Sequence, residues 1–387
     1  MSHRTHVLPR ALAAALALAL GACGDPPTKA PVPDRELLAV AGPTLAWNQT
    51  ARDLIAARAI GSPGTQVRIL TYLSVAQYNA IVAAEAAGGK ASPAAAAAGA
   101  SLVVLKSFFP LDTALLEEKL RTQKASAPWP EQPAKDVAAG ETIGRAVGAQ
   151  VLAYAATDKT NLTSRPPNPG GPGSWTGVNS ARGFYESRTF ALTSGDQFRP
   201  PPPPAFGSAV FNAALAEVRA FSDGLTPAQL MLSQDWGPRT GAYMNGVAAN
   251  LLVQPLRSDR EAARVLALAN MAGFDVLNAC FDAKFAYYFI RPSQTDPQIK
   301  LPIGLPNHPS YPSGHSCITA AYATVIASAF PEESDRLIAM IGETGLSRIY
   351  AGLHYRFDIT VGQELGRQVA GQVLRVSGNG RAAIPLD

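Results

Sequence analysis

The chain has 387 residues, of which 47% are hydrophobic and 16% are charged, a composition typical of a globular protein with one large domain or two modest ones. Its formal net charge of +4 is small, and no segment alternates lysine or arginine with aromatic residues, so we expect no nucleic-acid partner. Three cysteines are too few for a metal site built from CxxC pairs.

The N-terminus has the pattern of a secretory signal. Two arginines precede an apolar run at 11–20, and small residues then lead to Cys23. A bilayer span needs ~20 apolar residues, so this shorter run is typical of a signal peptide with a lipobox rather than of an uncleaved anchor helix. We therefore predict a lipoprotein signal peptide at 1–22, lipidation of Cys23, and a lipoprotein of the bacterial cell envelope that faces the periplasm.

Residues 23–34 carry prolines and charges and have little to bury, which predicts a tether between the lipid anchor and the folded domain. No later apolar run approaches the length of a membrane span, so we expect the body to be soluble. From residue 35 onward, apolar residues recur every three or four positions, as in helices. The helices expected in the first half cover 37–59, 67–87, 94–109, 113–125 and 137–156.

Between 158 and 207 the helical periodicity stops, and proline and glycine accumulate. This predicts a long irregular segment that packs through its aromatic residues and contributes possible lid residues. Helical periodicity then returns at 208–221, 227–236, 240–253, 259–289, 315–330, 332–350 and 357–376. Because no strand pattern competes, we predict an all-α fold, a helical bundle that forms a single domain over 35–387.

Once Cys23 is assigned to the lipid, Cys280 and Cys317 remain. Our working hypothesis is that these two form a disulfide in an oxidising envelope, and two buried free thiols are the alternative. The choice depends on the separation of the two Cα atoms, which the sequence does not supply.

The residues that carry chemistry gather in one stretch, 284–358. His3 and His6 belong to the predicted signal peptide, and the other three histidines all fall in this stretch. It contains three blocks, namely Lys284 with Arg291-Pro292, Pro312-Ser313-Gly314-His315, and Ser347-Arg348 with His354 and Asp358. Three cations with serine, glycine and histidine donors are what a multiply charged tetrahedral oxyanion needs, because each of its oxygens can accept a charge-assisted hydrogen bond. Phosphate and vanadate both fit.

The spacing within the first two blocks predicts how these donors are presented. Lys284 and Arg291 are seven residues apart, about two helical turns, so we expect them on one face of one helix. Pro312 is expected to stop the chain just before a helix begins. The Gly314 amide and the helix dipole would then face the anion.

The third block contains an oriented imidazole. His354 and Asp358 are four residues apart, so the carboxylate can accept a hydrogen bond from one ring nitrogen and leave the other for the anion centre. Such a histidine serves as a nucleophile or as a metal ligand. His315 is expected to transfer a proton on the opposite side of the anion.

In this order and spacing, the three blocks resemble the signature of the vanadium haloperoxidases and of the type 2 phosphatidic acid phosphatase (PAP2) superfamily that shares their fold. The neighbouring Tyr311 and Ile349-Tyr350 also look like the family. The resemblance implies a helical bundle in which the equatorial oxygens of the anion are bound by Lys284, Arg291, Ser313, Gly314 and Arg348. It implies that His354 is the apical partner, either the vanadium ligand of a haloperoxidase or the nucleophile of a phosphatase that becomes phosphohistidine. His315 would be the acid–base group in both chemistries.

The two chemistries imply different cofactors and substrates. A haloperoxidase would hold vanadate and oxidise bromide or iodide with hydrogen peroxide, whereas a phosphatase would hydrolyse phosphomonoesters without a cofactor. His308 favours the peroxidase, because algal bromoperoxidases similarly have a histidine in a His-Pro-Ser-Tyr-Pro-Ser-Gly-His segment; a rim residue without a redox role is the alternative. The long helical region before Lys284 also resembles the haloperoxidase layout, but the tryptophan that often precedes Arg-Pro in haloperoxidases is missing here.

We therefore predict vanadate-dependent halide peroxidation first and PAP2-type phosphomonoester hydrolysis through His354 second. An integral lipid phosphatase ranks lower, because those proteins are built from membrane-spanning helices. A non-enzymatic phosphate-binding envelope protein is also a lower alternative, since passive capture needs no oriented histidine.

Overall fold

The computed structural model describes residues 42–125, 135–161, 166–178, 184–253, 257–378 and 384–386. The predicted signal peptide, the lipidated Cys23 and the tether lie outside these residues. They stay predictions, as does the extent of the single domain.

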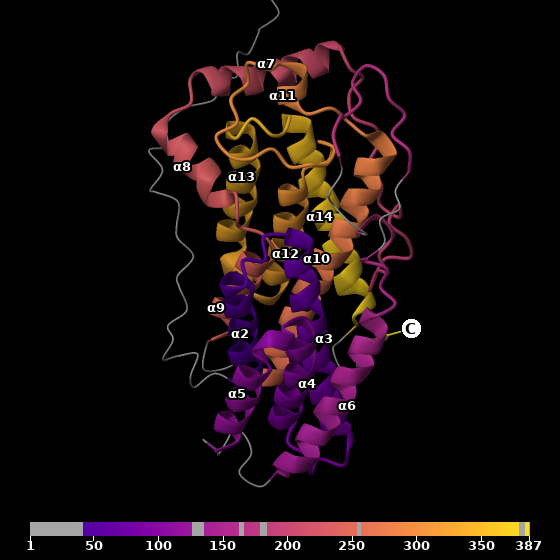
Figure 1. Cartoon of the computed structure of the whole chain (residues 1–387), viewed down its shortest axis with the longest axis vertical. Coiled ribbons are helices and arrows are strands. Elements are labelled where there is room, and N and C mark those ends of the chain that lie inside the picture. The colour runs from indigo at the N-terminus through magenta and orange to yellow at the C-terminus, as the bar shows by residue number, and fades with distance from the viewer. Residues whose placement is uncertain are drawn as a thin grey trace, which may run out of the picture. The chain divides into compact units, whose positions relative to one another are not determined.

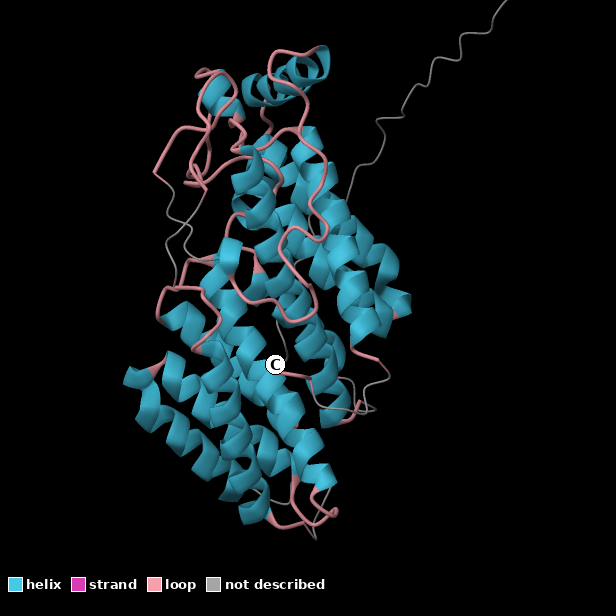
Figure 2. Cartoon of the chain, turned by 90° about the vertical axis from the view of Figure 1, so that its right-hand side faces the viewer, coloured by secondary structure: helices cyan, strands magenta, loops and turns pink. Residues whose placement is uncertain are grey.

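All regular secondary structure in the described residues is helical, and these residues contain no strand (Figures 1 and 2). The first half has α2 (Pro43–Ala57), α3 (Pro63–Ala86), α4 (Pro93–Phe108), η1 (Pro110–Asp112), α5 (Thr113–Ala125) and α6 (Val137–Ala155). The rest has η2 (Phe184–Glu186), α7 (Ala209–Asp223), α8 (Pro227–Trp236), α9 (Gly241–Leu252), α10 (Asp259–Tyr287), α11 (Pro292–Thr295), α12 (Gly314–Ala329), η3 (Pro331–Glu333), α13 (Ser334–Tyr350) and α14 (Arg356–Val376). The all-α prediction is confirmed.

Many of these helices begin at a residue whose side chain caps the first turn. A side-chain oxygen accepts a backbone N–H from the first turn at Ser62, Ser92, Asp136, Ser208, Thr226, Ser258 and Ser313. Proline follows directly in α3, α4 and α8, where its missing N–H costs nothing. These local signals explain why the expected helix starts fall close to the observed ones.

The long helix α10 is the core element that joins the two groups of helices. It packs on α3 from the N-terminal half and on α12 and α14 from the C-terminal half (Figure 1). By length and composition, α10 is apolar enough to cross a membrane. The expectation that no apolar run after the signal approaches the length of a membrane span is therefore wrong. Its most apolar window is 100% buried inside the protein, so its hydrophobicity is that of a helix surrounded by other helices.

Helices α4 and α6 pack at unusually short range because glycines line the contact. Gly140, Gly144 and Gly148 repeat every four residues on α6 and face the alanine-rich α4. A Cβ atom at Gly144 would lie 2.0 Å from the carbonyl oxygen of Ala96. The two backbones can therefore approach this closely only if the position lacks a side chain.

We expect Gly144→Ala to lower the free energy of unfolding by about 1–3 kcal/mol, because the new methyl group would push two buried helices apart. Chemical denaturation monitored by circular dichroism measures this loss. Gly342→Ala is the matched control, since a Cβ at this α13 glycine meets nothing within 4 Å. That control should be neutral or slightly stabilising, and equal losses in both variants would contradict the packing argument.

The described parts of the irregular 158–207 segment are fastened to α10 by carboxylates. Asp275 accepts hydrogen bonds from the backbone N–H groups of Phe190, Ala191 and Leu192 at 2.8, 2.7 and 3.2 Å. Arg199 makes two hydrogen bonds to Asp282, at 2.6 and 2.8 Å. The predicted packing of this segment holds for these parts, while its role as a lid stays a prediction.

The expected disulfide is not formed. Cys280 on α10 and Cys317 on α12 are free, buried thiols. The two thiols lie close enough together to affect each other's pKa, but no covalent bond joins their sulfurs.

Candidate active site

The three sequence blocks meet where the ends of five helices converge. Lys284 lies in the last turn of α10, Arg291 caps α11, Ser313 caps α12, Arg348 lies in the last turn of α13, and Asp358 lies in the first turn of α14. His354 is in the short connection between α13 and α14. Hydrogen bonds link the blocks directly, because Arg291 contacts both His308 and His354, and Ser310 donates to Asp358.

The expectation that Lys284 and Arg291 share one helix is wrong. Helix α10 ends at Tyr287, and Tyr288 adopts a left-handed conformation with φ of 46°. The chain then pairs with the irregular segment, since Trp175 N–H donates to the Tyr288 carbonyl at 2.6 Å and Ile290 N–H donates to the Gly173 carbonyl at 3.0 Å. This extended stretch brings Arg291 to the cluster from a separate element.

The ammonium group of Lys284 is bound by the turn that precedes α12. Its Nζ donates to the carbonyl oxygens of Pro309, Ser310 and Pro312 at 2.8, 2.8 and 2.5 Å. An ammonium has three hydrogens, so all of them have carbonyl acceptors here. Lys284 therefore organises the turn that leads to Ser313, and its charge acts on an anion from beneath that turn.

Arg291 connects two of the histidines. Its Nη1 donates to the Leu353 carbonyl at 2.8 Å and lies 3.4 Å from His354 Nε2, and its Nη2 lies 3.1 Å from His308 Nδ1. Its Nε donates to the His308 carbonyl at 3.0 Å. A guanidinium only donates, so His354 Nε2 acts as an acceptor, whereas His308 Nδ1 also lies 3.1 Å from the Pro309 carbonyl, which itself only accepts.

The predicted pairing of His354 and Asp358 is present. His354 Nδ1 lies 2.9 Å from Asp358 Oδ2, and the Ser310 hydroxyl donates to the same oxygen at 2.6 Å. When the Nδ1 hydrogen of His354 is donated to the carboxylate of Asp358, the lone pair of the ring is on Nε2, which faces Arg291. Ser310 was not anticipated, although it lies between His308 and the second block.

Helix α12 begins as the second block predicts. The Ser313 hydroxyl accepts hydrogen bonds from the N–H and the hydroxyl of Ser316 at 3.4 and 3.1 Å, which leaves its own hydrogen for another acceptor. A Cβ atom at Gly314 would meet nothing within 4 Å, so open space lies beside this first residue of the helix. That arrangement suits an anion at a helix N-terminus.

Two donors of the cluster contact the end of α8, which sequence reasoning missed. His315 Nε2 lies 3.1 Å from the Gly237 carbonyl, and Arg348 Nη2 donates to the Ser233 carbonyl at 3.1 Å. A carbonyl oxygen only accepts, so Nε2 carries the hydrogen and Nδ1 of His315 has the lone pair. Backbone carbonyls have no sequence signature, and no motif could have revealed this contact.

The cluster has an excess of buried positive charge. Lys284, Arg291 and Arg348 are at most 1% exposed, and the buried Asp358 carboxylate near them is hydrogen bonded to Ser310 and His354 rather than to a cation. Burial lowers the pKa of Lys284 to about 8 and the pKa of each arginine to about 10, so all three are cationic near neutral pH. Buried charge of one sign is costly, and a multiply charged anion would neutralise it.

The three histidines are neutral at the same pH. Burial, aided by the charge of Arg348, lowers the pKa of His315 to about 3. Burial and the neighbouring cations also hold the pKa values of His308 and His354 well below the usual range. In this state each imidazole has a lone pair with which to accept a proton or bind an electrophilic centre.

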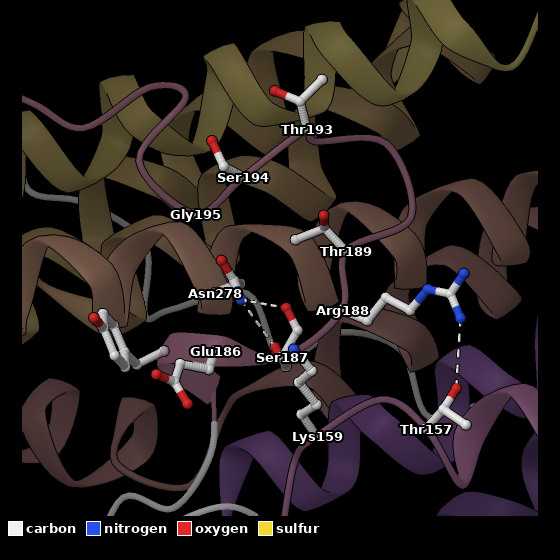
Figure 3. A pocket seen from close by; sticks show the side chains of 11 residues that line it. Thr157, Lys159, Glu186, Ser187, Arg188, Thr189, Thr193, Ser194, Gly195 and Asn278 are labelled. Atoms are coloured by element: carbon white, nitrogen blue, oxygen red, sulfur yellow. Dashed lines mark hydrogen bonds between the residues drawn. The ribbon is translucent and has the colours of Figure 1, made fainter. Parts of the chain in front are cut away.

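A separate polar cavity of about 650 Å³ lies over the middle of α10 (Figure 3). The irregular segment supplies most of its walls, including Lys159 and Arg188, and Asn278 of α10 forms part of its floor. The Asn278 amide donates to the Ser187 carbonyl and hydroxyl at 2.7 and 3.0 Å. These hydrogen bonds fasten this part of the cavity wall to α10. None of the predicted oxyanion residues lines this cavity.

Comparisons of sequence connect the site region to phosphatases. Residues 263–381 match the PAP2 superfamily. A non-specific acid phosphatase of Providencia stuartii is 36% identical over 75 residues, which cover 19% of this chain and 29% of that enzyme. A non-specific acid phosphatase of Salmonella typhi is 37% identical over 57 residues, 15% of this chain and 23% of that enzyme. The chain thus spans less than a third of these relatives.

Comparisons of structure extend over nearly the whole chain. The first bacterial vanadium-dependent iodoperoxidase superposes with a TM-score of 0.66 at 22% identity, covering 86% of this chain and 96% of that one. An apo-type bacterial vanadium-dependent chloroperoxidase gives a TM-score of 0.68 at 13% identity, with 84% and 95% covered. At these identities the likeness establishes the fold. Residues 263–381 are thus similar to the PAP2 superfamily, and the helical fold of the chain is that of the bacterial vanadium-dependent haloperoxidases.

Proposed function

We propose that this protein is an enzyme that binds vanadate and oxidises bromide or iodide with hydrogen peroxide. The observation that carries the proposal is the buried cluster of three cations beside an oriented, neutral histidine. The proposal is supported by the haloperoxidase fold over most of the chain, and by the proton-accepting state of His315.

The donor set suits vanadate. Arg291 and Arg348 would neutralise the charge on the equatorial oxygens, the Gly314 amide and the Ser313 hydroxyl would donate to them, and Lys284 would contribute its charge from beneath the turn. His354 Nε2, on the ring that Asp358 holds, would bind the vanadium. Bound vanadate supplies a Lewis-acidic centre that polarises peroxide oxygen.

Proton handling favours peroxidation over phosphate hydrolysis. Peroxide must lose a proton to bind as an anion, and a neutral His315 can accept it. A leaving alcohol of a phosphomonoester needs a proton instead, and with its pKa held near 3 His315 has none to give in the free site. His308 is also neutral and hydrogen bonded to Arg291, so it is a second proton acceptor at the edge of the cluster.

Phosphomonoester hydrolysis with His354 as nucleophile is the second candidate. The matches to two acid phosphatases favour it, and binding of a dianionic substrate would itself raise the pKa of His315 toward the protonated form. Vanadate resembles the transition state of phosphoryl transfer, so binding of vanadate alone does not separate the two functions.

The discriminating experiment uses protein stripped of metal and phosphate. Oxidation of bromide and iodide by peroxide and hydrolysis of a chromogenic phosphomonoester are followed in the same samples, before and after orthovanadate is added. We expect vanadate to switch on halide oxidation and to suppress any phosphate hydrolysis. If vanadate merely inhibits a fast phosphatase, the protein is a phosphohydrolase and the first proposal fails.

His308→Ala is expected to reduce halide oxidation about 10²-fold, because removal of a general base or acid typically costs that much or more. Phosphate hydrolysis should change far less, since it has no use for this proton acceptor. Both rates measured on one preparation check the prediction. Equal losses, or none, would mean that His308 only packs against Arg291 and Phe281.

We further propose that the chain is a periplasm-facing lipoprotein held to the membrane through Cys23. The support is the N-terminal sequence alone. Metabolic labelling with a radiolabelled fatty acid, compared between the natural chain and Cys23→Ser, tests it.

A further inference from the structure

Two thiols lie in direct contact beneath the oxyanion cluster. Cys280 on α10 and Cys317 on α12 are each 0% exposed, and their sulfurs are near enough for each thiol to affect the pKa of the other. Cys280 Sγ is also 3.8 Å from the Pro312 carbonyl oxygen. Since α10 and α12 pack side by side, the contact joins two core elements of the site (Figure 1).

The surroundings of the pair differ from those of an ordinary buried thiol. Cys280 is one helical turn from Lys284, and both donate to the carbonyl of Pro312. Although burial acts to raise it, the hydrogen bond from Cys317 and the charge of Lys284 bring the pKa of Cys280 below its usual value. Burial and Cys280 hold the pKa of Cys317 well above its usual value. Of the two, Cys280 therefore loses its proton more readily, and Cys317 stays a thiol.

We propose that Cys280 and Cys317 form a peroxide-reactive dithiol, which hydrogen peroxide converts reversibly into a disulfide that ties α10 to α12 beneath the oxyanion cluster. The geometry that supports this is the direct sulfur contact together with the position of Cys280 next to Lys284. The inference stands apart from the proposed halide chemistry, because it requires neither vanadate nor halide.

The reaction balances with peroxide as the two-electron oxidant. The Cys280 thiolate attacks one peroxide oxygen, an S–O bond forms, the O–O bond breaks, and the departing hydroxide takes up the proton that Cys280 released, giving water. Cys317 then attacks the Cys280 sulfur, the S–S bond forms and the S–O bond breaks, and the second hydroxide leaves as water with the Cys317 proton. Two thiols and one peroxide thus give one disulfide and two waters.

Packing restricts which oxidants can reach the pair. Helix α14 crosses over Cys317 so closely that a Cβ atom at Gly362 would lie 3.3 Å from its sulfur. The turn before α12 covers the pair on another side, since the Pro312 carbonyl oxygen lies 3.8 Å from Cys280 Sγ. A small uncharged oxidant is therefore favoured over bulky thiol reagents.

The test treats the full chain with hydrogen peroxide in the absence of vanadate and halide. Thiols are then alkylated in denaturant and peptides are mapped, so that Cys23 is counted separately. We expect the Cys280 and Cys317 peptides to lose their free thiols together, to appear as one cross-linked peptide, and to be restored by dithiothreitol. A bulky aromatic disulfide reagent should leave both thiols of the native protein unreacted over the same period.

A matched pair of variants tests the assigned roles. In Cys317→Ala, Cys280 should stop at the sulfenic acid, which dimedone traps on unfolding, whereas in Cys280→Ala the Cys317 thiol should survive. If peroxide leaves both natural thiols intact at doses that oxidise methionine, or if both variants behave alike, the proposal is overturned. The natural-chain result needs no variant, so a variant that fails to fold does not weaken the test.

Discussion

Replacing His354 with alanine is expected to lower turnover by about 10³-fold or more in either proposed chemistry. His354 Nε2 is the lone-pair atom that Asp358 orients toward the cluster, and no other imidazole in the described residues has a carboxylate partner. Without it, a bound vanadate would lack the ring nitrogen proposed to hold it, and a phosphoryl group would lack its proposed nucleophile. Steady-state rates of halide oxidation and of phosphomonoester hydrolysis measure the effect.

The control for this variant is anion binding. The three cations remain in His354→Ala, so phosphate should still bind, measured by calorimetry, even though turnover is lost. Circular dichroism should show an unchanged helix content. A variant that keeps its turnover would exclude His354 from the reaction, and one that neither binds phosphate nor folds would require the milder His354→Gln for the same comparison.

The second large effect concerns Asp358 and acidity. Burial raises the pKa of Asp358 to about 6, with the Ser310 hydrogen bond acting in the opposite direction. Below that pH the carboxylate is protonated and no longer holds the His354 Nδ1 hydrogen, so kcat/KM of the free enzyme should fall about tenfold per pH unit as pH decreases below 6. Asp358→Asn should be about 10–100-fold slower and should lack this acid limb.

Ser310→Ala provides the comparison for the pH profile. The Ser310 hydroxyl stabilises the ionised carboxylate through a 2.6 Å hydrogen bond, so its removal should raise the pKa of Asp358 further. The acid limb of the rate profile should then move to higher pH, while the rate at high pH changes little. An acid limb that stays in place in both variants would mean that another group limits the reaction in acid.

The sequence predicted most of the helices because their ends are marked locally. Val137, Pro227 and Asp259 start helices at the predicted residue, and each follows a residue whose side chain caps the helix. The pairing of His354 with Asp358 was predictable for the same reason, since a separation of four residues and one following helix turn determine it.

The prediction for Lys284 and Arg291 failed because a constant spacing of seven residues does not reveal where a helix ends. Tyr288 leaves the helix in a left-handed conformation, and the stretch behind it is stabilised by hydrogen bonds to Gly173 and Trp175, more than a hundred residues earlier. A partner so distant in the chain overrides local periodicity. The disulfide expected from the two cysteines is absent for a different reason. Two thiols that lie close together form a bond only when an oxidant removes their hydrogens.

By itself, the sequence determined the all-helical class, most of the helix starts, and the identity of the charged residues in the three blocks, because each of these depends on side chains close together in the chain. Only the tertiary structure decided which groups surround those residues. The α8 carbonyls that accept from Arg348 and His315 come from positions 115 and 78 residues away, and the thiols of Cys280 and Cys317 meet only where α10 crosses α12. Backbone carbonyls are the same in every residue, so their positions follow from packing rather than from sequence.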